Sequence, residues 1–261
     1  MTKLKHFGCL KIKHFVLFIT FMGMIACRQS QDRLINIEGK QLIVDSTYAV
    51  VDSISNFILP YHNHVEKMLD STLAYASLDI SKTDGIYNTT AGNLMADIIL
   101  EQAAPIFKSR TGKDLDFVLL NHGGIRSSIS KGKVSARTAF EVMPFENNTV
   151  VVELKGQSVK EMLTYLIRSK RAHPIAGIQL VLDKDDSIKS LTIQGVPFDE
   201  KKSYYVATSD YLVSGGDDMF FFKDALKVTD IDYKIRNALI DYFTKVDTLA
   251  PIVDLRYYKI E

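Results

Sequence analysis

Three short segments carry residues whose types and spacing suit the binding of a small molecule. The first is NHGGIR, residues 121–126. Neither Gly123 nor Gly124 has a Cβ, so the backbone there can approach a ligand closely. Arg126 offers a fork of donors for a carboxylate, a phosphate or ribose hydroxyls. A tight turn followed by a surface arginine explains the same spacing, and this segment alone does not separate the two interpretations.

The other two segments each present an aromatic ring beside polar side chains. They are MPFENN, residues 143–148, with Phe145, and SDYLVSGGD, residues 209–217, with Tyr211 and Asp217. The two rings could sandwich a planar heterocycle, because base–aromatic stacking contributes roughly 1–3 kcal/mol per base. The carboxylate could accept hydrogen bonds from a vicinal diol. Taken singly, core aromatic residues and an Asx turn explain these segments as well.

Apolar periodicity predicts the elements that position these segments. We expect strands at 116–120, 149–154, 178–182, 191–193, 204–208 and 252–259, and a short hairpin at 33–45 around Gly39. We expect helices at 53–69 with a kink or a new start at Pro60, at 93–107 with a Thr89 or Thr90 cap, at 158–168 and at 230–246. Strands outnumber helices and come partly in hairpins, which predicts an α+β fold with helices covering sheet faces.

The first 26 residues are typical of an export signal. Four lysines precede an almost wholly apolar run, residues 15–26, which is shorter than the ~20 residues of a membrane span. The run ends in GMIAC, which resembles a bacterial lipobox with Cys27 as the lipidated residue. An ordinary cleaved signal is the alternative. We expect a signal peptide over 1–26, a tether with the hairpin over 27–52 and one domain over 53–261, in an exported lipoprotein anchored to the membrane at the cell envelope.

Charge and cysteine usage narrow the class of protein. The formal net charge is +1, and removal of the four lysines of the signal changes it to +1 − 4 = −3. Bulk charge therefore gives no reason to expect binding to a nucleic acid polymer or to an anionic membrane. Cys9 lies inside the signal, so the mature chain has no cysteine pair for a disulfide. Such an exported chain must be held together by its core.

Four motifs in order resemble the C-terminal domain of the 5'-nucleotidase family. They are TTAGNLMAD at 89–97, NHGGIR at 121–126, FEVMPFEN at 140–147 and YLVSGGD at 211–217. Each is weak alone, but the four in family order are specific, and the resemblance covers residues 53 to the C-terminus. It implies a four-layer α/β/β/α sandwich that binds the nucleoside half of a nucleotide.

The resemblance also implies a role for each matching residue. Phe145 and Tyr211 correspond to two aromatic residues that clamp the base. The polar positions of the same pocket are Asn121 and Asn147 as amides, Arg126 and Asp217 as contacts to the ribose or the base edge, and Gly124 against the pocket wall. The sequence departs from the family in two places: no arginine shortly precedes the first motif, and Asp218 stands where the family has glycine. If that glycine has a positive φ, the loop here must differ or carry strain.

The family hydrolyses phosphate esters with two metals held in a separate N-terminal domain, and none of its DxH, GDxxD, GNHE or GHxH motifs occurs in this sequence. His62 and His64 would point apart on a helix, and His122 suits a turn. We therefore expect no catalytic residues, metal or cofactor in this chain, and divalent metals on a partner. Whether the chain belongs to an enzyme stays open.

The leading hypothesis is the nucleoside-recognition part of a split 5'-nucleotidase that acts with a separate metallophosphoesterase chain. The alternatives are a nucleoside-binding envelope lipoprotein that acts alone and a degenerate scaffold domain. The first alternative predicts tight binding of nucleosides without any partner, and the second predicts a folded protein that binds none.

Overall fold

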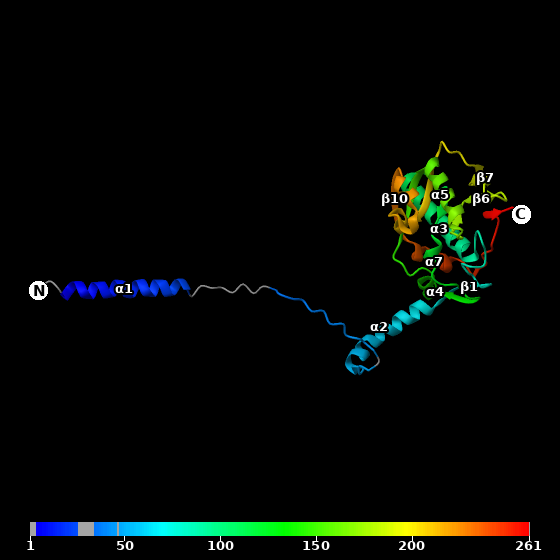
Figure 1. The fold of residues 1–261 in the computed structure, drawn as a ribbon. Helices are drawn as coiled ribbons and strands as arrows, with labels where there is room; N and C mark the ends of the chain where they lie inside the picture. Colours follow the sequence, from blue (N-terminus) through cyan, green and yellow to red (C-terminus); the bar gives the residue numbers. More distant parts are fainter. Residues whose placement is uncertain (1–3, 26–33, 46, 261) are drawn as a thin grey trace. The chain divides into compact units, whose positions relative to one another are not determined.

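The structure is a computed structural model that describes residues 4–25, 34–45 and 47–260 (Figure 1). Internal contacts divide the chain into two units, residues 1–52 and 53–261. The first unit contains α1 (Leu4–Ile25). No helix in the described part of the chain is both long and apolar enough to cross a membrane. Cys27, the predicted lipidation site, lies outside the described residues.

The hairpin predicted at 33–45 is wrong. Over the described residues 34–45 the backbone forms neither strand nor helix, and every side chain is exposed. A two-stranded hairpin is marginally stable in water unless it packs against another element. Here no such packing occurs, so the weak alternation around Gly39 does not suffice to form strands.

Within the described residues, the second unit holds three sheets (Figure 1). The five-stranded sheet has the order β10-β4-β9-β2-β5, with strands β2 (Phe117–Leu119), β4 (Asn148–Lys155), β5 (Ile175–Ala176), β9 (Ser203–Ser209) and β10 (Lys227–Lys234). The four-stranded sheet has the order β12-β6-β7-β8, with strands β6 (Ile178–Leu182), β7 (Ile188–Ile193), β8 (Val196–Pro197) and β12 (Tyr257–Lys259). The three-stranded sheet has the order β11-β1-β3, with strands β1 (Thr72–Ala76), β3 (Gly132–Ser135) and β11 (Thr248–Leu249).

The helices are α2 (Asp52–Asp70), α3 (Thr90–Thr111), α4 (Ala136–Val142), α5 (Gly156–Ser169), α6 (Asp210–Val213) and α7 (Ile235–Lys245). The described residues also form three short 3₁₀ helices: η1 (His122–Gly124), η2 (Gly216–Asp218) and η3 (Phe220–Asp224). As expected, the Thr89 side chain caps α3 by accepting a hydrogen bond from the Gly92 amide. α2 continues through Pro60 as one helix, so the alternative of a second helix starting there is wrong.

The core lies on both faces of the five-stranded sheet. In β2, Val118 packs with the apolar side chains of α3 and α7, whereas Phe117 and Leu119 pack on the opposite face with α5 and the four-stranded sheet. The same division separates Val151 from Val152 in β4, because successive side chains of a strand point to opposite faces. The expected α+β sandwich of stacked helices and sheets is confirmed.

Long-range pairing moves two boundaries near the C-terminus. Asp230 and Tyr233 were expected in the last helix but lie in β10, which pairs antiparallel with β4, and α7 begins at Ile235. The final strand covers only 257–259, not 252–259. Residues 252–254 form neither helix nor strand, and the Asn93 side chain donates to the Ile252 carbonyl at 2.8 Å.

A close backbone contact explains why glycine occupies the first position of α5. The helix begins at Gly156 with Lys155 as its N-cap, two residues before the predicted Ser158. A Cβ on Gly156 would lie 2.2 Å from the Glu200 carbonyl oxygen. Only glycine therefore fits where this helix passes the loop before β9.

Candidate functional site

One edge of the five-stranded sheet collects the three segments singled out in the sequence. β9 runs parallel to β2 and antiparallel to β4. The ends of β2 and β9 and the start of β4 therefore lie at the same edge of the sheet. Residues 121–126 follow β2, residues 143–148 lead into β4, and residues 209–217 follow β9.

A single cavity of about 280 Å³ lies at this edge. All seven predicted site residues line it, together with Gly123; they are Asn121, Gly124, Arg126, Phe145, Asn147, Tyr211 and Asp217. The structure thus brings together side chains that are almost a hundred residues apart, such as Asn121 and Asp217, whose separation in sequence is 96 residues.

The Asp217 carboxylate is held from both sides. Asn121 Nδ2 donates to its Oδ2 at 2.8 Å, and the Tyr211 hydroxyl donates to its Oδ1 at 3.1 Å. The hydrogen bond to this carboxylate raises the pKa of the Tyr211 phenol, so the hydroxyl stays protonated and keeps donating. The arrangement presents a fixed acceptor to the cavity.

The two aromatic rings are available to a ligand. Phe145 is 40% exposed and Tyr211 is 44% exposed, although both line the cavity. The Arg126 guanidinium lies 5.9 Å from the centre of the Phe145 ring, within the range of a cation–π contact. Partly exposed rings around a cavity can accept a flat partner without any movement of the core.

Glycines shape the wall of the cavity at two points. A Cβ on Gly216 would lie 2.4 Å from the Tyr211 ring, and a Cβ on Gly124 would lie 2.9 Å from Asn121 Oδ1. Real Cβ atoms do not approach so closely, so larger residues would displace the ring or the amide. The absence of a side chain at Gly216 and Gly124 therefore allows Tyr211 and Asn121 to lie where they do.

Two residues that contact the loops of the site, Tyr165 and His173, were not predicted from the sequence. The Tyr165 hydroxyl of α5 donates to the Asp217 carbonyl at 2.8 Å, and His173 Nδ1 accepts a hydrogen bond from the His122 amide at 3.3 Å. His173 is 2% exposed, and burial lowers the pKa of its imidazole to about 4. No local pattern marks either residue, because each acts through a loop that is distant in sequence.

A third supporting residue, also unpredicted, holds the Phe145 loop. Arg236, at the start of α7, is 5% exposed and donates at 3.3 Å to the carbonyls of Pro144 and Phe145. Arg236 also forms an ion pair with Glu146, and hydrogen bonds from Arg236 and Lys234 lower the pKa of the Glu146 carboxyl to about 2. The Phe140 ring lies 4.1 Å from its guanidinium. Arg236 therefore ties the loop to the helix.

The turn after Gly216 has an unusual backbone. Asp217 and Asp218 have φ of 52° and 59°, in the left-handed region that glycine adopts without penalty. The sequence raised the question of whether Asp218 occupies a position of positive φ, and it does. Aspartate tolerates this region better than most residues, but the conformation still costs energy.

Replacing Asp218 with glycine should stabilise the protein. Glycine removes the left-handed penalty of roughly 1–2 kcal/mol but makes the unfolded chain more flexible, so the net gain should be about 0.5–1 kcal/mol. Urea unfolding of both proteins measures it. The control is Asp224→Gly, which ends η3 outside the positive-φ region and should destabilise. Equal effects of the two substitutions would contradict the assignment of strain to Asp218.

The histidines have structural surroundings. His62 and His64 are exposed on α2, and His122 Nδ1 lies 3.3 Å from the Ala172 carbonyl oxygen. Among the residues that the structure describes, no group of three or more His, Cys, Asp or Glu side chains is placed to hold a metal ion.

Comparison with known proteins now identifies the domain. A sequence model described as 5'-nucleotidase, C-terminal domain, matches residues 72–224. The chain belongs to this family. The resemblance predicted from the four motifs is thereby confirmed for the 5'-nucleotidase C-terminal domain, and the matched region contains every residue of the candidate site.

Relatives of this 5'-nucleotidase C-terminal domain are much longer proteins. Cell wall protein Lmo0130 of Listeria monocytogenes is 28% identical over 193 residues, which cover 65% of this chain and 24% of that protein. Protein UshA of Escherichia coli K12 is 37% identical over 112 residues, which cover 41% of this chain and 20% of that protein. The chain thus matches about a quarter or less of the length of these relatives.

The fold agrees with solved structures of the family. The 5'-nucleotidase precursor from Thermus thermophilus superposes with a TM-score of 0.66 over 80% of this chain and 43% of that protein, at 22% identity. At this identity the likeness establishes the fold alone.

Proposed function

We propose that this domain recognises the nucleoside half of a nucleotide in the cavity between Phe145 and Tyr211. The observation that supports the proposal most is the convergence of two half-exposed rings, two amides and a fixed carboxylate on one cavity of about 280 Å³. This volume lies just below the ~300–1,000 Å³ range of small-molecule sites, as suits a ligand as small as a nucleoside.

The chemistry of each side chain fits a part of a nucleoside. The rings of Phe145 and Tyr211 offer faces for a planar base. Asp217 offers acceptor lone pairs for the two hydroxyls of a ribose, and the amides of Asn121 and Asn147 can donate to and accept from the base edge. Arg126 stands at the same cavity as a cation for an anionic substituent.

Isothermal titration calorimetry with adenosine and AMP tests the proposal. Phe145→Ala and Tyr211→Ala should each weaken binding about fivefold to a hundredfold, because each removes one stacking surface worth roughly 1–3 kcal/mol. Tyr75→Ala is the matched control, since Tyr75 is 51% exposed on β1 and does not line the cavity. If both pocket variants bind as tightly as the wild type, the rings do not hold the base. A folded protein that binds no nucleoside would favour the scaffold alternative.

The proposed partner is a separate metallophosphoesterase chain that supplies the metals and cuts the ester. Binding energy from base and sugar would then position the phosphate at those metals. The apolar face of α2 supports the existence of a partner: Ile54, Phe57, Ile58, Tyr61, Val65 and Met68 recur at helical spacing and are 49–72% exposed. The helix is tied to the domain by Arg137, which pairs with Glu66 and Asp70.

Reconstitution tests the partnership. AMP hydrolysis should rise well above additivity when the protein is mixed with a metallophosphoesterase encoded beside it. Phe57→Ser should reduce that gain, whereas Tyr75→Ser, at another exposed aromatic ring outside α2, should not. Simple additivity would contradict the split enzyme and favour a binding protein that acts alone.

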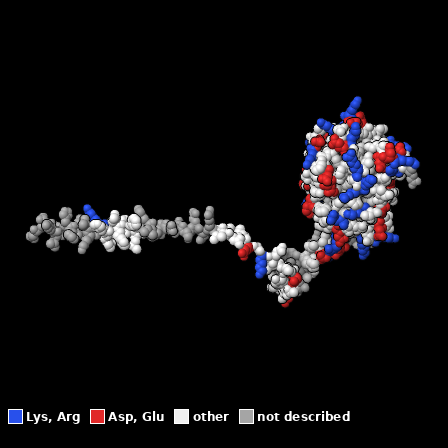
Figure 2. Space-filling view, viewed as in Figure 1, with Lys and Arg blue, Asp and Glu red and all other residues white. Residues whose placement is uncertain are grey.

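Export and anchoring are the last part of the proposal. A relative named as a cell wall protein supports export, and the lipobox-like sequence supports a lipid on Cys27. On the face drawn in Figure 2, lysine and arginine are interspersed with aspartate and glutamate over the second unit, which gives no footprint for a nucleic acid polymer. Mass spectrometry of the protein purified from membranes tests the lipid, and an unmodified Cys27 would refute it.

A further inference from the structure

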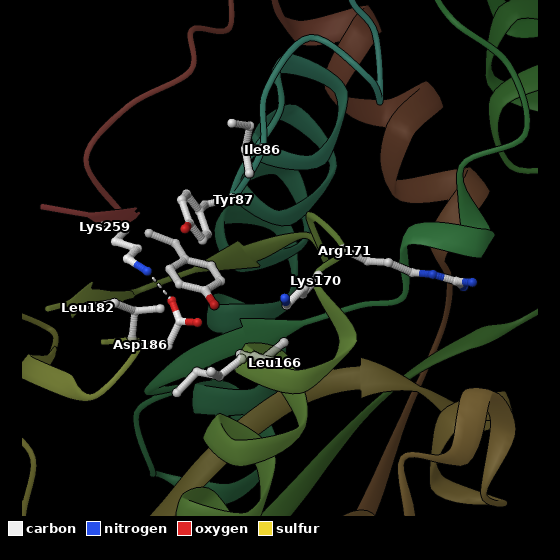
Figure 3. Close-up of a pocket in the computed structure, with 10 residues that line it drawn as sticks. Ile86, Tyr87, Leu166, Lys170, Arg171, Leu182, Asp186 and Lys259 are labelled. Atoms are coloured by element: carbon white, nitrogen blue, oxygen red, sulfur yellow. Dashed lines mark hydrogen bonds and ion pairs between the residues drawn. The ribbon is translucent and has the colours of Figure 1, made fainter. Parts of the chain in front are cut away.

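A second cavity, of about 210 Å³, lies at the C-terminal end of α5 (Figure 3). Its walls come from α5, the residues after it, strands β6 and β12, and the segment before α3. None of its residues lines the first cavity. The volume equals about seven times the ~30 Å³ that a water molecule occupies in the liquid, which leaves room for a small organic molecule.

The inner surface of this cavity is apolar and aromatic. Leu166 and Leu182 are each 1% exposed and line it from α5 and β6. The rings of Tyr87 and Tyr257 pack against each other with centroids 4.9 Å apart and planes at 50°. A hydrated inorganic ion gains nothing from such a surface, whereas the body of an organic molecule does.

The hydroxyl of Tyr257, which lines this cavity, has no hydrogen-bond partner among the described residues and is not one of the fully buried polar atoms. The residue as a whole is 3% exposed. Burial raises the pKa of this phenol, so the hydroxyl remains a donor at physiological pH. The donor is therefore free to bind an oxygen of a ligand in the cavity.

Positive charge at the mouth exceeds negative charge. Lys259 is neutralised by Asp186, with Nζ 2.5 Å from Oδ1. Lys170 has no ion pair or hydrogen bond to any side chain among the described residues, and in Figure 3 its ammonium points toward the cavity while Arg171 extends away. The position after the last turn of α5 favours a cation there without using its donors.

We propose that this cavity is a second binding site, for a small organic anion whose carboxylate or phosphate oxygen contacts Tyr257 and Lys170. Its apolar body lies on Leu166 and Leu182. The phenol and the ammonium supply hydrogen bonds to the oxyanion, and the ammonium balances its charge. The Asp186–Lys259 ion pair lines the side of the cavity opposite Lys170 (Figure 3). This inference does not depend on nucleoside binding, because the two cavities share no residue.

Fluorine NMR of the purified protein tests the site with 4-fluorobenzoate as the probe and 4-fluorobenzamide as its uncharged counterpart. The benzoate signal should broaden, and the benzamide signal should not. Lys170→Met and Tyr257→Phe should each weaken benzoate binding about tenfold. Tyr257→Phe should not lower stability, because the hydroxyl that it removes has no protein partner.

Two controls make the outcomes decisive. Lys189→Met, at an exposed lysine of β7 away from the cavity, should leave benzoate binding unchanged, and so should Tyr211→Ala in the first cavity. Loss of binding with Tyr211→Ala, equal binding of the benzamide or an unaffected Lys170→Met variant would each overturn the proposal. Inorganic phosphate should compete only weakly, and strong competition would overturn the role of the apolar body.

Discussion

Replacing Arg236 with methionine should lower the free energy of unfolding by about 2–3 kcal/mol and weaken nucleoside binding about tenfold. The buried guanidinium donates to two backbone carbonyls of the Phe145 loop and pairs with Glu146. Charge-assisted hydrogen bonds contribute about 1.5–3 kcal/mol each, and the carbonyls would lose their donor. The loop that carries one wall of the cavity would then be free to move. Urea unfolding and AMP titration measure the two effects.

The control for this substitution is Arg137→Met. Arg137 also pairs with two carboxylates, Glu66 and Asp70, but its side chain is 37% exposed. Exposed ion pairs contribute about 0–1 kcal/mol, so its loss should be small and should leave AMP binding unchanged. If Arg236→Met destabilises the protein without affecting binding, Arg236 stabilises the fold but does not position Phe145.

Lowering the pH should lower the free energy of unfolding because His173 is buried in its neutral form. A His173→Gln variant should lose this part of the pH dependence. The pKa of the buried imidazole is about 4, against about 6.5 for an exposed histidine. Between these values the unfolded chain binds the proton and the folded one does not. Stability is therefore complete above pH 6.5 and is lost as the pH falls toward 4. The loss from this group should approach about 3 kcal/mol.

The measurement is the difference between wild type and variant in urea unfolding from pH 7 to pH 4.5, because other groups titrate equally in both. The wild type should lose stability relative to His173→Gln as the pH falls. His62→Gln is the control, since its imidazole is exposed on α2 and solvated in both states. A constant difference between wild type and His173→Gln over this range would show that the pKa of His173 is the same in the folded and unfolded states.

The sequence alone identified every residue that lines the candidate site except Gly123, and Gly123 lies inside one of the motifs. Glycine pairs beside polar and aromatic residues are local signals, and their order along the chain points to the family. The residues that hold the site gave no such signal. Tyr165 and His173 act on loops distant in sequence, and Arg236 lies in a predicted helix where no local pattern distinguishes it.

The same distinction explains the errors in the fold. Local patterns predict β6 at its observed bounds and α5 within two residues of its observed bounds. β10 is an edge strand that exists because β4 offers it a partner, and local periodicity assigned part of it to α7. The alternating residues 34–45 form no strand, and all their side chains are exposed. Pairing between distant residues decides such cases, and one-dimensional patterns do not contain it.

For the proposed nucleoside site, the fixed position of the Asp217 carboxylate predicts selectivity among sugars. Since Asn121 and Tyr211 fix the carboxylate before any ligand arrives, binding orders no new rotamer there, and the free and occupied loops should superimpose. A carboxylate held in this way cannot reorient when the ligand has no hydroxyl to donate to it. A 2'-deoxynucleoside would leave one lone pair desolvated and unmatched, so the pocket should discriminate against DNA-type sugars without any lid or closing motion.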